Sequence, residues 1–180
     1  MQSDDLVSTT QPYAAYFCEE NLWWWCHGLT ASQRQASWVV IVSNPQRKAA
    51  VALQRLGAGE AGVLIWDYHV VGLHCPAADT SSIVDFDTTL STPVLDAQWW
   101  LTVQNKLAKS VEEQHRALLR PLPAESYYKG FSSTRSHMLL PDGSYIHPPP
   151  TWPAITNRPA EFTDLEGLLD QDALPGWFSP

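Results

Sequence analysis

The chain has 180 residues, of which 44% are hydrophobic and 17% are charged, so it is long enough and apolar enough for one substantial core. Eleven Lys and Arg residues against nineteen Asp and Glu residues give a net charge of −8. No run of basic residues forms a positive face, which argues against nucleic acid or an anionic membrane as a partner. No apolar run reaches the roughly 18 residues that a membrane span needs.

The cysteines and the first residues indicate the cellular compartment of the protein. Three cysteines are an odd number, and their spacing matches neither a disulfide scaffold nor a zinc module. The first residues, MQSDDLVSTTQ, lack the basic flank and the apolar core of a secretion signal. We expect a monomeric protein of the reducing cytosol, with the nucleus as a second location.

Residues 1–11 are expected to form a flexible leader to a single domain over residues 12–180. The first predicted helix covers residues 18–29, where one apolar stripe recurs with helical spacing: Cys18, Leu22, Trp25, Cys26 and Leu29. Trp24 points away from this stripe, because successive helical residues lie about 100° apart. We therefore expect a central helix that is covered on more than one side.

Three strand signals follow the helix, at residues 38–44, 63–74 and 82–90, each rich in β-branched or aromatic residues. The run AAVALQRLG between the first two is interpreted as a further strand, and HCPAADTSS as a hairpin connection.

Helices are predicted for the second half of the chain. Residues 95–114 predict a helix that Asp96 caps, and residues 123–130 a short helix that ends at Gly130. A further short helix is expected at residues 164–171. One helix followed by an antiparallel sheet and then by helices predicts an α+β domain.

Cys18 stands at the start of the first predicted helix. Unpaired N–H groups and the positive end of the helix dipole stabilise an anion there, which lowers the pKa of a thiol. The same N–H groups can form part of an oxyanion hole. The alternative is an inert core residue, because cysteine is among the most often buried residue types.

His69 and a nearby aspartate would complete a set for nucleophilic chemistry. A cysteine nucleophile needs an imidazole base, and the base needs a carboxylate or amide that fixes its orientation. His69 and Asp85 lie on strands that are expected to be adjacent, where residues on one face come within reach. Asp87 shares the face of Asp85, so the strand pattern leaves both aspartates as candidates.

A metal site is the competing chemistry, because His69, His74 and Cys75 are close in sequence and the two aspartates are near. On a regular strand His69 and His74 point to opposite faces, being an odd number of residues apart. We expect His74 to be a structural residue, and the protein to bind no metal and no other cofactor.

Five segments resemble the protein N-terminal glutamine amidohydrolase family, in that family's order. They are YFCEENLW (16–23), WDYHVVGLH (66–74), VDFDTTL (84–90), SSTRSHM (132–138) and PPPTWPAI (148–155). The resemblance covers most of the chain from about Tyr13 to Trp177, with little match in the leader and in residues 106–122. Phe17 departs from it, since relatives often carry Tyr before the cysteine.

The resemblance implies a cysteine hydrolase core of the transglutaminase and papain type, in which the helix with the nucleophile packs on an antiparallel sheet. It implies Cys18 as nucleophile, His69 as base and Asp85 as the residue that orients the base. The implied reaction converts an N-terminal glutamine of a protein or peptide to glutamate and releases ammonia through a Cys18 thioester. In the N-degron pathway this step comes before arginylation.

Such a reaction needs groups that recognise the substrate's free α-ammonium. Glu19, Glu20 and Asp87 are the candidate acids, although Glu19 and Glu20 also suit the first turn of a helix. Ser136 and His137 are candidates for lining the site. The neighbouring arginine of SSTRSHM is interpreted as a structural ion-pair residue.

Two other functions compete with this interpretation. A transglutaminase-like enzyme or another cysteine hydrolase would act on internal glutamines or backbone bonds and would not need a free amine. A catalytically silent module would bind protein N-termini in the same acidic, aromatic pocket. The complete Cys–His–Asp set favours an enzyme, because a binding module has no need of all three.

Overall fold

The computed structural model describes residues 6–77, 80–156 and 162–163. In this part of the chain an antiparallel sheet of five strands lies at the centre, in the order β6-β5-β4-β1-β7. Its strands are β1 (Ser37–Ser43), β4 (Tyr68–Ala77), β5 (Thr80–Val84), β6 (Val94–Asp96) and β7 (Leu118–Pro123).

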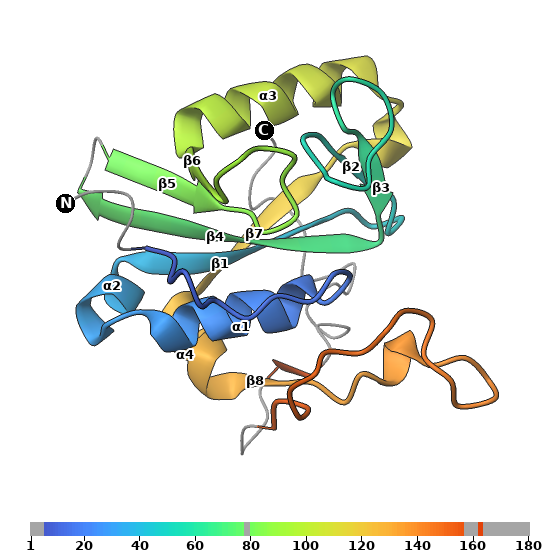
Figure 1. The fold of residues 1–180 in the computed structure, drawn as a ribbon. Coiled ribbons are helices and arrows are strands. Elements are labelled where there is room, and N and C mark those ends of the chain that lie inside the picture. The colour runs from blue at the N-terminus through green and yellow to red at the C-terminus, as the bar shows by residue number, and fades with distance from the viewer. Residues whose placement is uncertain (1–5, 78–79, 157–161, 164–180) are drawn as a thin grey trace.

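Helices cover both faces of this sheet (Figure 1). Helix α1 (Cys18–Gly28) and helix α4 (Ala124–Gly130) lie on one face, and helix α3 (Ala97–Ser110) lies on the other. The predicted α+β class, with the Cys18 helix packed on an antiparallel sheet, is thereby confirmed.

The smaller elements surround this centre. Strands β2 (Ala49–Val51) and β3 (Leu64–Trp66) form an antiparallel pair, and β8 (Phe131–Ser132) pairs in parallel with β9 (Phe162–Thr163). The short helices are α2 (Ala31–Gln35), η2 (Glu113–His115) and η3 (Ser136–Met138).

Strand β1 is apolar on both sides because both of its faces are covered. Val39 packs in the cluster that holds Trp25 of α1, and Val40 packs in the cluster that holds Trp100 of α3. Neighbouring residues of a strand point to opposite faces, so an apolar run of this kind marks a strand between two layers.

Helix α1 is central, as the sequence predicted. The whole predicted stripe is buried, with no member more than 5% exposed. Trp23 donates its indole N–H to the carbonyl of Tyr128 in α4 (3.0 Å), and Trp24 packs edge-on against Trp152 (6.1 Å between ring centroids). Trp25 packs on strand β4. The three consecutive tryptophans thus each join α1 to a different part of the protein.

The long strand predicted over residues 63–74 was wrong, because two strands occupy this stretch. Asp67 separates β3 from β4, and its side chain accepts a hydrogen bond from the backbone N–H of Tyr68 (2.8 Å). Strand β3 leaves the main sheet to pair with β2, which confirms the strand that was expected in AAVALQRLG.

The stretch HCPAADTSS, predicted as a hairpin connection, differs from the prediction in its described residues, which belong to β4 and β5. Most of HCPAADTSS is strand, with Ala77 paired with Thr80. Strand β5 ends at Val84, so Asp85 and Asp87 follow the strand and do not alternate along it.

The predicted helices of the second half are confirmed within the described residues. The Asp96 side chain accepts the backbone N–H of Trp99 at 2.7 Å and so caps α3, and α4 ends at Gly130 as expected. The helix expected at residues 164–171 lies outside the described residues. None of the described helices is long and apolar enough to cross a membrane.

Candidate active site

A pocket of about 400 Å³ opens at the start of α1. Tyr16 and Cys18 form one wall, residues 66–68 together with Arg47 form a second, and residues 137–138 with residues 146–147 form a third. Segments that are far apart in the sequence therefore meet around the Cys18 side chain.

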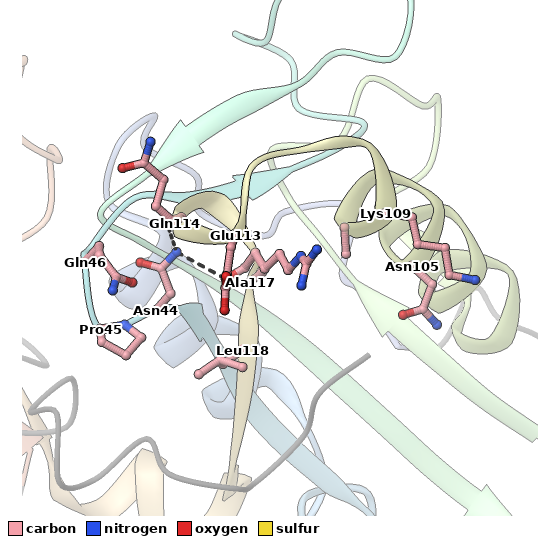
Figure 2. Close-up of a pocket in the computed structure, with 11 residues that line it drawn as sticks. Asn44, Pro45, Gln46, Asn105, Lys109, Glu113, Gln114, Ala117 and Leu118 are labelled. Carbon is pink, nitrogen blue, oxygen red and sulfur yellow. Dashed lines mark hydrogen bonds between the residues drawn. The ribbon is translucent and has the colours of Figure 1, made fainter.

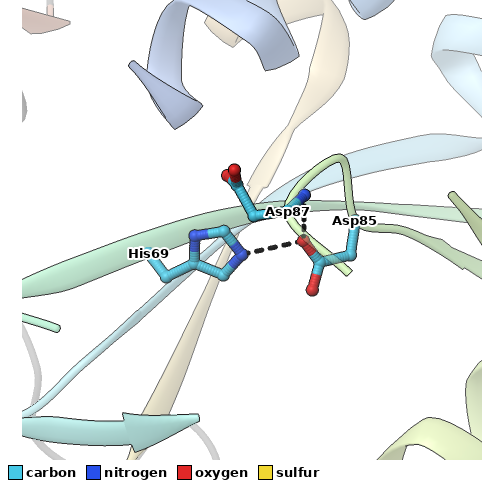
Figure 3. A group of neighbouring side chains, drawn as sticks. All are labelled: His69, Asp85 and Asp87. Atoms are coloured by element: carbon cyan, nitrogen blue, oxygen red, sulfur yellow. Dashed lines mark hydrogen bonds and ion pairs between the residues drawn. The ribbon is translucent and has the colours of Figure 1, made fainter. Parts of the chain in front are cut away.

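His69 and Asp85 form a buried pair (Figure 3). His69 Nε2 lies 3.0 Å from Asp85 Oδ1, and both residues are 0% exposed. The backbone N–H of Asp87 donates to the same oxygen (3.0 Å), and the carboxylate of Asp87 points away from this hydrogen bond. His69 Nδ1 is buried and has no hydrogen-bond partner among the described residues. Asp85 thus fixes the imidazole and leaves Nδ1 for chemistry.

Two residues that sequence reasoning missed complete this arrangement. The side-chain amide of Gln54 donates to Asp85 Oδ2 (2.9 Å) and accepts the indole N–H of Trp66 (3.2 Å). The Trp66 ring in turn stacks on His69, with 5.1 Å between centroids and 14° between planes. A polar residue within the apolar run VALQRL, and the tryptophan of WDYH, were the available signals.

Cys18 lies beside strand β4, next to the base. Its sulfur accepts from the backbone of Val70 and lies 3.6 Å from Glu19 Oε2. Because β5 ends at Val84, opposite Gly72, no strand of that side pairs with Val70, whose other side pairs with Ile41 of β1. Within the described residues no hydrogen bond joins Cys18 to His69, so the resting thiol is turned toward Glu19.

The pKa of the Cys18 thiol is raised well above its ordinary value, contrary to the effect expected of a helix start. Burial is the largest cause, and the negative charges of Glu19 and Asp87 add to it. The backbone of Val70 lowers the pKa but does not outweigh them. The resting structure therefore favours the neutral thiol.

The pKa values of His69 and Asp85 are shifted in opposite directions. Burial alone would lower the pKa of His69, but the charge and hydrogen bond of Asp85 raise it above its ordinary value. Burial alone would raise the pKa of Asp85, but His69, Gln54 and the Asp87 backbone lower it. The arrangement favours a proton on the imidazole and a charge on Asp85.

Glu19 and Asp87 are buried acids beside this site. Glu19 Oε1 lies 3.7 Å from His137 Nε2, and Asp87 Oδ1 accepts the Tyr13 hydroxyl at 2.6 Å. Asp87 Oδ2 is buried without a hydrogen-bond partner among the described residues. Burial is the main cause that raises the pKa of Asp87.

Glu20 has a different place. Its two oxygens accept from Arg135 at 2.7 and 2.8 Å, and Oε2 also accepts the indole N–H of Trp152 at 2.6 Å. The ion pair expected of Arg135 is confirmed. Since both oxygens are engaged, Glu20 ties residues 135 and 152 to α1. Glu19 and Asp87 do not border the pocket, but their charges act on the Cys18 thiol.

Of the two predicted lining residues, only His137 borders the pocket. Its Nε2 also lies 3.3 Å from the hydroxyl of Tyr68, which borders the pocket too. Ser136 is exposed, accepts from the hydroxyl of Thr134 (2.9 Å) and does not line the pocket.

The histidine and the two aspartates are the one group in the described residues that is close enough to hold a metal ion, with ligand atoms within 4.8 Å of one another. However, the amide of Gln54 and the backbone N–H of Asp87 both donate to Asp85. Oδ1 of Asp85 also faces His69 Nε2, so both oxygens of this carboxylate are engaged by protein groups. His74 is apart from this group, with Nδ1 2.8 Å from Ser37 Oγ.

A larger hollow, of about 810 Å³, lies away from these residues (Figure 2). It is bordered by residues 44–46, by the end of α3 and by residues 113–114 and 116–118. The Asn44 side chain donates to the carbonyls of Gln114 and Arg116 (2.9 and 3.1 Å), so its polar groups hold these segments together. The smaller pocket carries the candidate chemistry.

A buried, oriented imidazole beside a cysteine that stands at a helix start and borders a pocket is the arrangement of enzymes that use histidine for proton transfer. Comparison with known proteins narrows this class. The family model for N-terminal glutamine amidase matches residues 13–173, and the chain belongs to this family.

Curated relatives carry the corresponding name. The protein N-terminal glutamine amidohydrolase of Drosophila ananassae is 36% identical over 161 residues, which cover 88% of this chain and 76% of that protein. The protein of the same name from Drosophila pseudoobscura pseudoobscura is 36% identical over 149 residues, covering 81% of this chain and 72% of that protein. The resemblance inferred from the five segments is thereby confirmed.

Proposed function

We propose that this protein hydrolyses the side-chain amide of an N-terminal glutamine in proteins or peptides, giving glutamate and ammonia. The observation that carries the proposal is the buried His69–Asp85 pair beside Cys18, which itself borders a pocket, in a member of the N-terminal glutamine amidase family.

The first half of the reaction forms a thioester. The Cys18 sulfur turns from Glu19 and attacks the amide carbon, while Nδ1 of His69 takes the thiol proton in those molecules in which the imidazole is neutral. The oxyanion is stabilised by backbone N–H groups at the start of α1, including that of Cys18. His69 then gives its proton to the leaving nitrogen, the carbon–nitrogen bond breaks, and ammonia departs.

The second half hydrolyses the thioester. Neutral His69 takes a proton from water, the hydroxide attacks the carbonyl carbon, and the Cys18 sulfur leaves with the proton that His69 returns. Asp85 keeps Nε2 of His69 protonated throughout, so Nδ1 alone exchanges protons.

Glu19 and Asp87 suit the recognition of the substrate's α-ammonium. Both acids are buried beside the thiol and raise its pKa, so a cation that binds between them offsets their charge. The ammonium would thus make the Cys18 thiol easier to ionise. A substrate without a free amine lacks this effect, which gives the enzyme a reason to act only on chain ends.

The proposed reaction also suggests the setting. We place the protein in the cytosol, as a monomer, and ahead of arginylation in the N-degron pathway, because the reaction creates an N-terminal acid. The proposed core is of the transglutaminase and papain type, which the order of a nucleophile helix and an antiparallel sheet supports.

The test is ammonia release from short peptides that begin with Gln, Asn or N-acetyl-Gln. We expect release from free N-terminal Gln, with Asn at least about tenfold slower, because one methylene is worth roughly 1–3 kcal/mol. Cys18→Ala should reduce the rate by about a thousandfold or more. Cys75→Ala, at a half-buried cysteine outside the pocket, is the matched control and should retain activity.

Other results point to the competing functions. Equal turnover of N-acetyl-Gln would favour a transglutaminase-like enzyme that needs no free amine. Binding of the peptides without any ammonia release, unchanged by Cys18→Ala, would identify a binding module and contradict the proposal.

A further inference from the structure

Gln54 is a polar residue in the interior of the protein, shortly after β2. It is 0% exposed. Its backbone is held in place, because its N–H donates to the carbonyl of Gly62 (2.8 Å) and the residue forms a β-bridge with Thr88. A buried amide costs free energy unless its polar atoms are hydrogen-bonded. The partners of this side chain therefore decide what it contributes.

The hydrogen bonds of Gln54 fix which way its amide faces. The indole N–H of Trp66 can only donate, so the atom 3.2 Å from it is the amide oxygen. The amide nitrogen lies on the other side, where it donates to Asp85 Oδ2 (2.9 Å) and to the carbonyl of Ala52 (3.3 Å). The opposite orientation would set the amide oxygen against a carboxylate and a carbonyl, so all three contacts require the same one.

Gln54 engages the oxygen of Asp85 that His69 does not. Oδ1 of Asp85 faces His69 Nε2, and Oδ2 points away from the imidazole (Figure 3). The terminal torsion of an aspartate is broad, so partners on one oxygen alone leave the carboxylate free to turn. The bond from Gln54 restricts this rotation. Burial raises the pKa of Asp85, and the Gln54 amide is one of the contacts that lower it and favour the charged form.

Four side chains form a closed ring of contacts around this bond. Trp66 stacks on His69, with 5.1 Å between ring centroids, and also donates to Gln54. Gln54 donates to Asp85, which completes the ring at His69. Each member is thus held by two others. The imidazole is fixed at Nε2 by a carboxylate and across its plane by an indole, and Gln54 joins these two supports.

We infer that Gln54 is a positioning residue of the reaction, which acts through Asp85: its amide holds the carboxylate on His69 Nε2, so that Nδ1 remains the atom that exchanges protons. The inference rests on the proposed function and adds a residue to it. Gln54 is not among the described residues that border the pocket. Its loss should therefore affect the chemical step and leave substrate binding unchanged.

The test removes the amide and keeps the length of the side chain. In Gln54→Met, kcat for a peptide that begins with Gln should fall by about ten- to a hundredfold, because a hydrogen bond to a charged carboxylate is lost. KM should stay within about twofold, since no residue that borders the pocket is changed. Steady-state kinetics of ammonia release gives both constants.

Gln104→Met is the matched control. Gln104 is another buried glutamine (8% exposed), and its amide accepts the backbone N–H of Ala52 (3.0 Å) and donates to the Ala52 carbonyl (3.4 Å). Within the described residues it supports the segment after β2 without a hydrogen bond to the buried pair, so kcat should stay within about twofold. Thermal melting shows what each substitution costs the fold. An unchanged kcat in Gln54→Met, or an equal fall in Gln104→Met, would overturn the inference.

Nuclear magnetic resonance of the wild-type protein tests the inference without turnover. The side-chain amide signal of Gln54 should shift with pH at the midpoint of the His69 imidazole, because both groups bind the Asp85 carboxylate. The amide signal of Gln104 in the same spectra should not follow that midpoint. A Gln54 signal that ignores the titration of His69 would contradict the inference, even if Gln54→Met fails to fold. A wild type that hydrolyses no peptide would contradict the proposed function instead, and the amide signal would still decide the role of Gln54.

Discussion

At Cys18, the start of a helix and burial act on the thiol in opposite directions. The helix start favours a thiolate, but the side chain is 3% exposed and lies next to Glu19, with Asp87 adding a second negative charge. Desolvation and these charges outweigh the helix, so the pKa of the thiol is raised. A resting cysteine of this kind resists oxidation and alkylation, because the thiolate is the reactive form.

Alkylation of Cys18 by iodoacetamide should therefore be slow at neutral pH and rise with a midpoint above pH 9, the ordinary value for a cysteine. Glu19→Gln should move this midpoint to lower pH, because it removes the charge closest to the sulfur. Glu112→Gln, at an exposed acid, is the control and should not move it. Peptide mass spectrometry after timed labelling gives the rates. A midpoint below pH 7 would show that the helix dominates.

The sequence predicted the candidate catalytic residues better than the residues that hold them in place. Cys18, His69 and the two aspartates stood out because chemistry restricts which residue types can serve. The family resemblance favoured Asp85 over Asp87, and the structure pairs His69 with Asp85. Gln54 and Trp66 were missed because they come from beside and within the small β2–β3 sheet, and only tertiary packing brings that sheet to His69. No local sequence pattern shows that Gln54 reaches Asp85 or that Trp66 reaches His69.

Helix α1 depends on close packing against strand β4. The Trp25 ring lies over Gly72, where an added Cβ would come within 2.8 Å of the ring. Trp25 is 1% exposed, and its indole N–H is bonded to the carbonyl of Leu6 (2.9 Å), so the ring has little freedom to move. Only glycine fits beneath this tryptophan. The absence of a side chain at position 72 therefore allows α1 to pack this close to β4.

Gly72→Ala should lower the free energy of unfolding by about 1–3 kcal/mol, because it overfills a packed core. Gly28→Ala is the matched control, since a Cβ at this exposed end of α1 has no atom within 4 Å. The control should leave stability unchanged or raise it by up to about 1 kcal/mol. Urea unfolding of both variants gives the two values. Equal stability of Gly72→Ala and the wild type would mean that Trp25 can be displaced without cost.

Helices were easier to predict than strands. The apolar period defined α1 and the Asp96 cap defined the start of α3, because both signals are local. The separation of β3 from β4 at Asp67 could not be predicted, since β3 pairs with β2 and β4 with β1. Which strands pair is decided only when the sheets assemble. The apolar pattern is the same before and after Asp67, so it does not reveal that one strand ends and another begins there.

The whole molecule should be most stable at mildly acidic pH. Burial alone would lower the pKa of His69, but Asp85 raises it, so its stabilising effect is complete below pH 6.5 and is lost as the pH rises through the folded-state pKa. Asp85, whose pKa His69 lowers against the effect of burial, contributes above pH 3.8 and loses its effect as the pH falls through the folded-state pKa. Self-repulsion at a net charge of −8 acts in the same direction at high pH.

We expect the melting temperature to be highest between about pH 4 and pH 6.5 and to fall toward pH 8. Asp85→Asn should lower it at pH 6 and flatten the fall between about pH 6.5 and pH 8, because His69 then loses the charge that raises its pKa. His115→Ala, at a histidine outside the site, should retain the wild-type slope. Scanning calorimetry at fixed ionic strength measures both. A slope that persists in Asp85→Asn would assign the pH dependence to other groups.

The ion pair between Glu20 and Arg135 bears on how the protein is made. Glu20 is buried in the first turn of α1, and its partner follows 115 residues later in the chain. A growing chain on the ribosome thus carries an uncompensated acid in its central helix until that late segment emerges, and residues 137–147 complete the pocket only after it. The pocket is therefore complete only after residues 137–147 have emerged, and incomplete chains that end before Arg135 are left unstable.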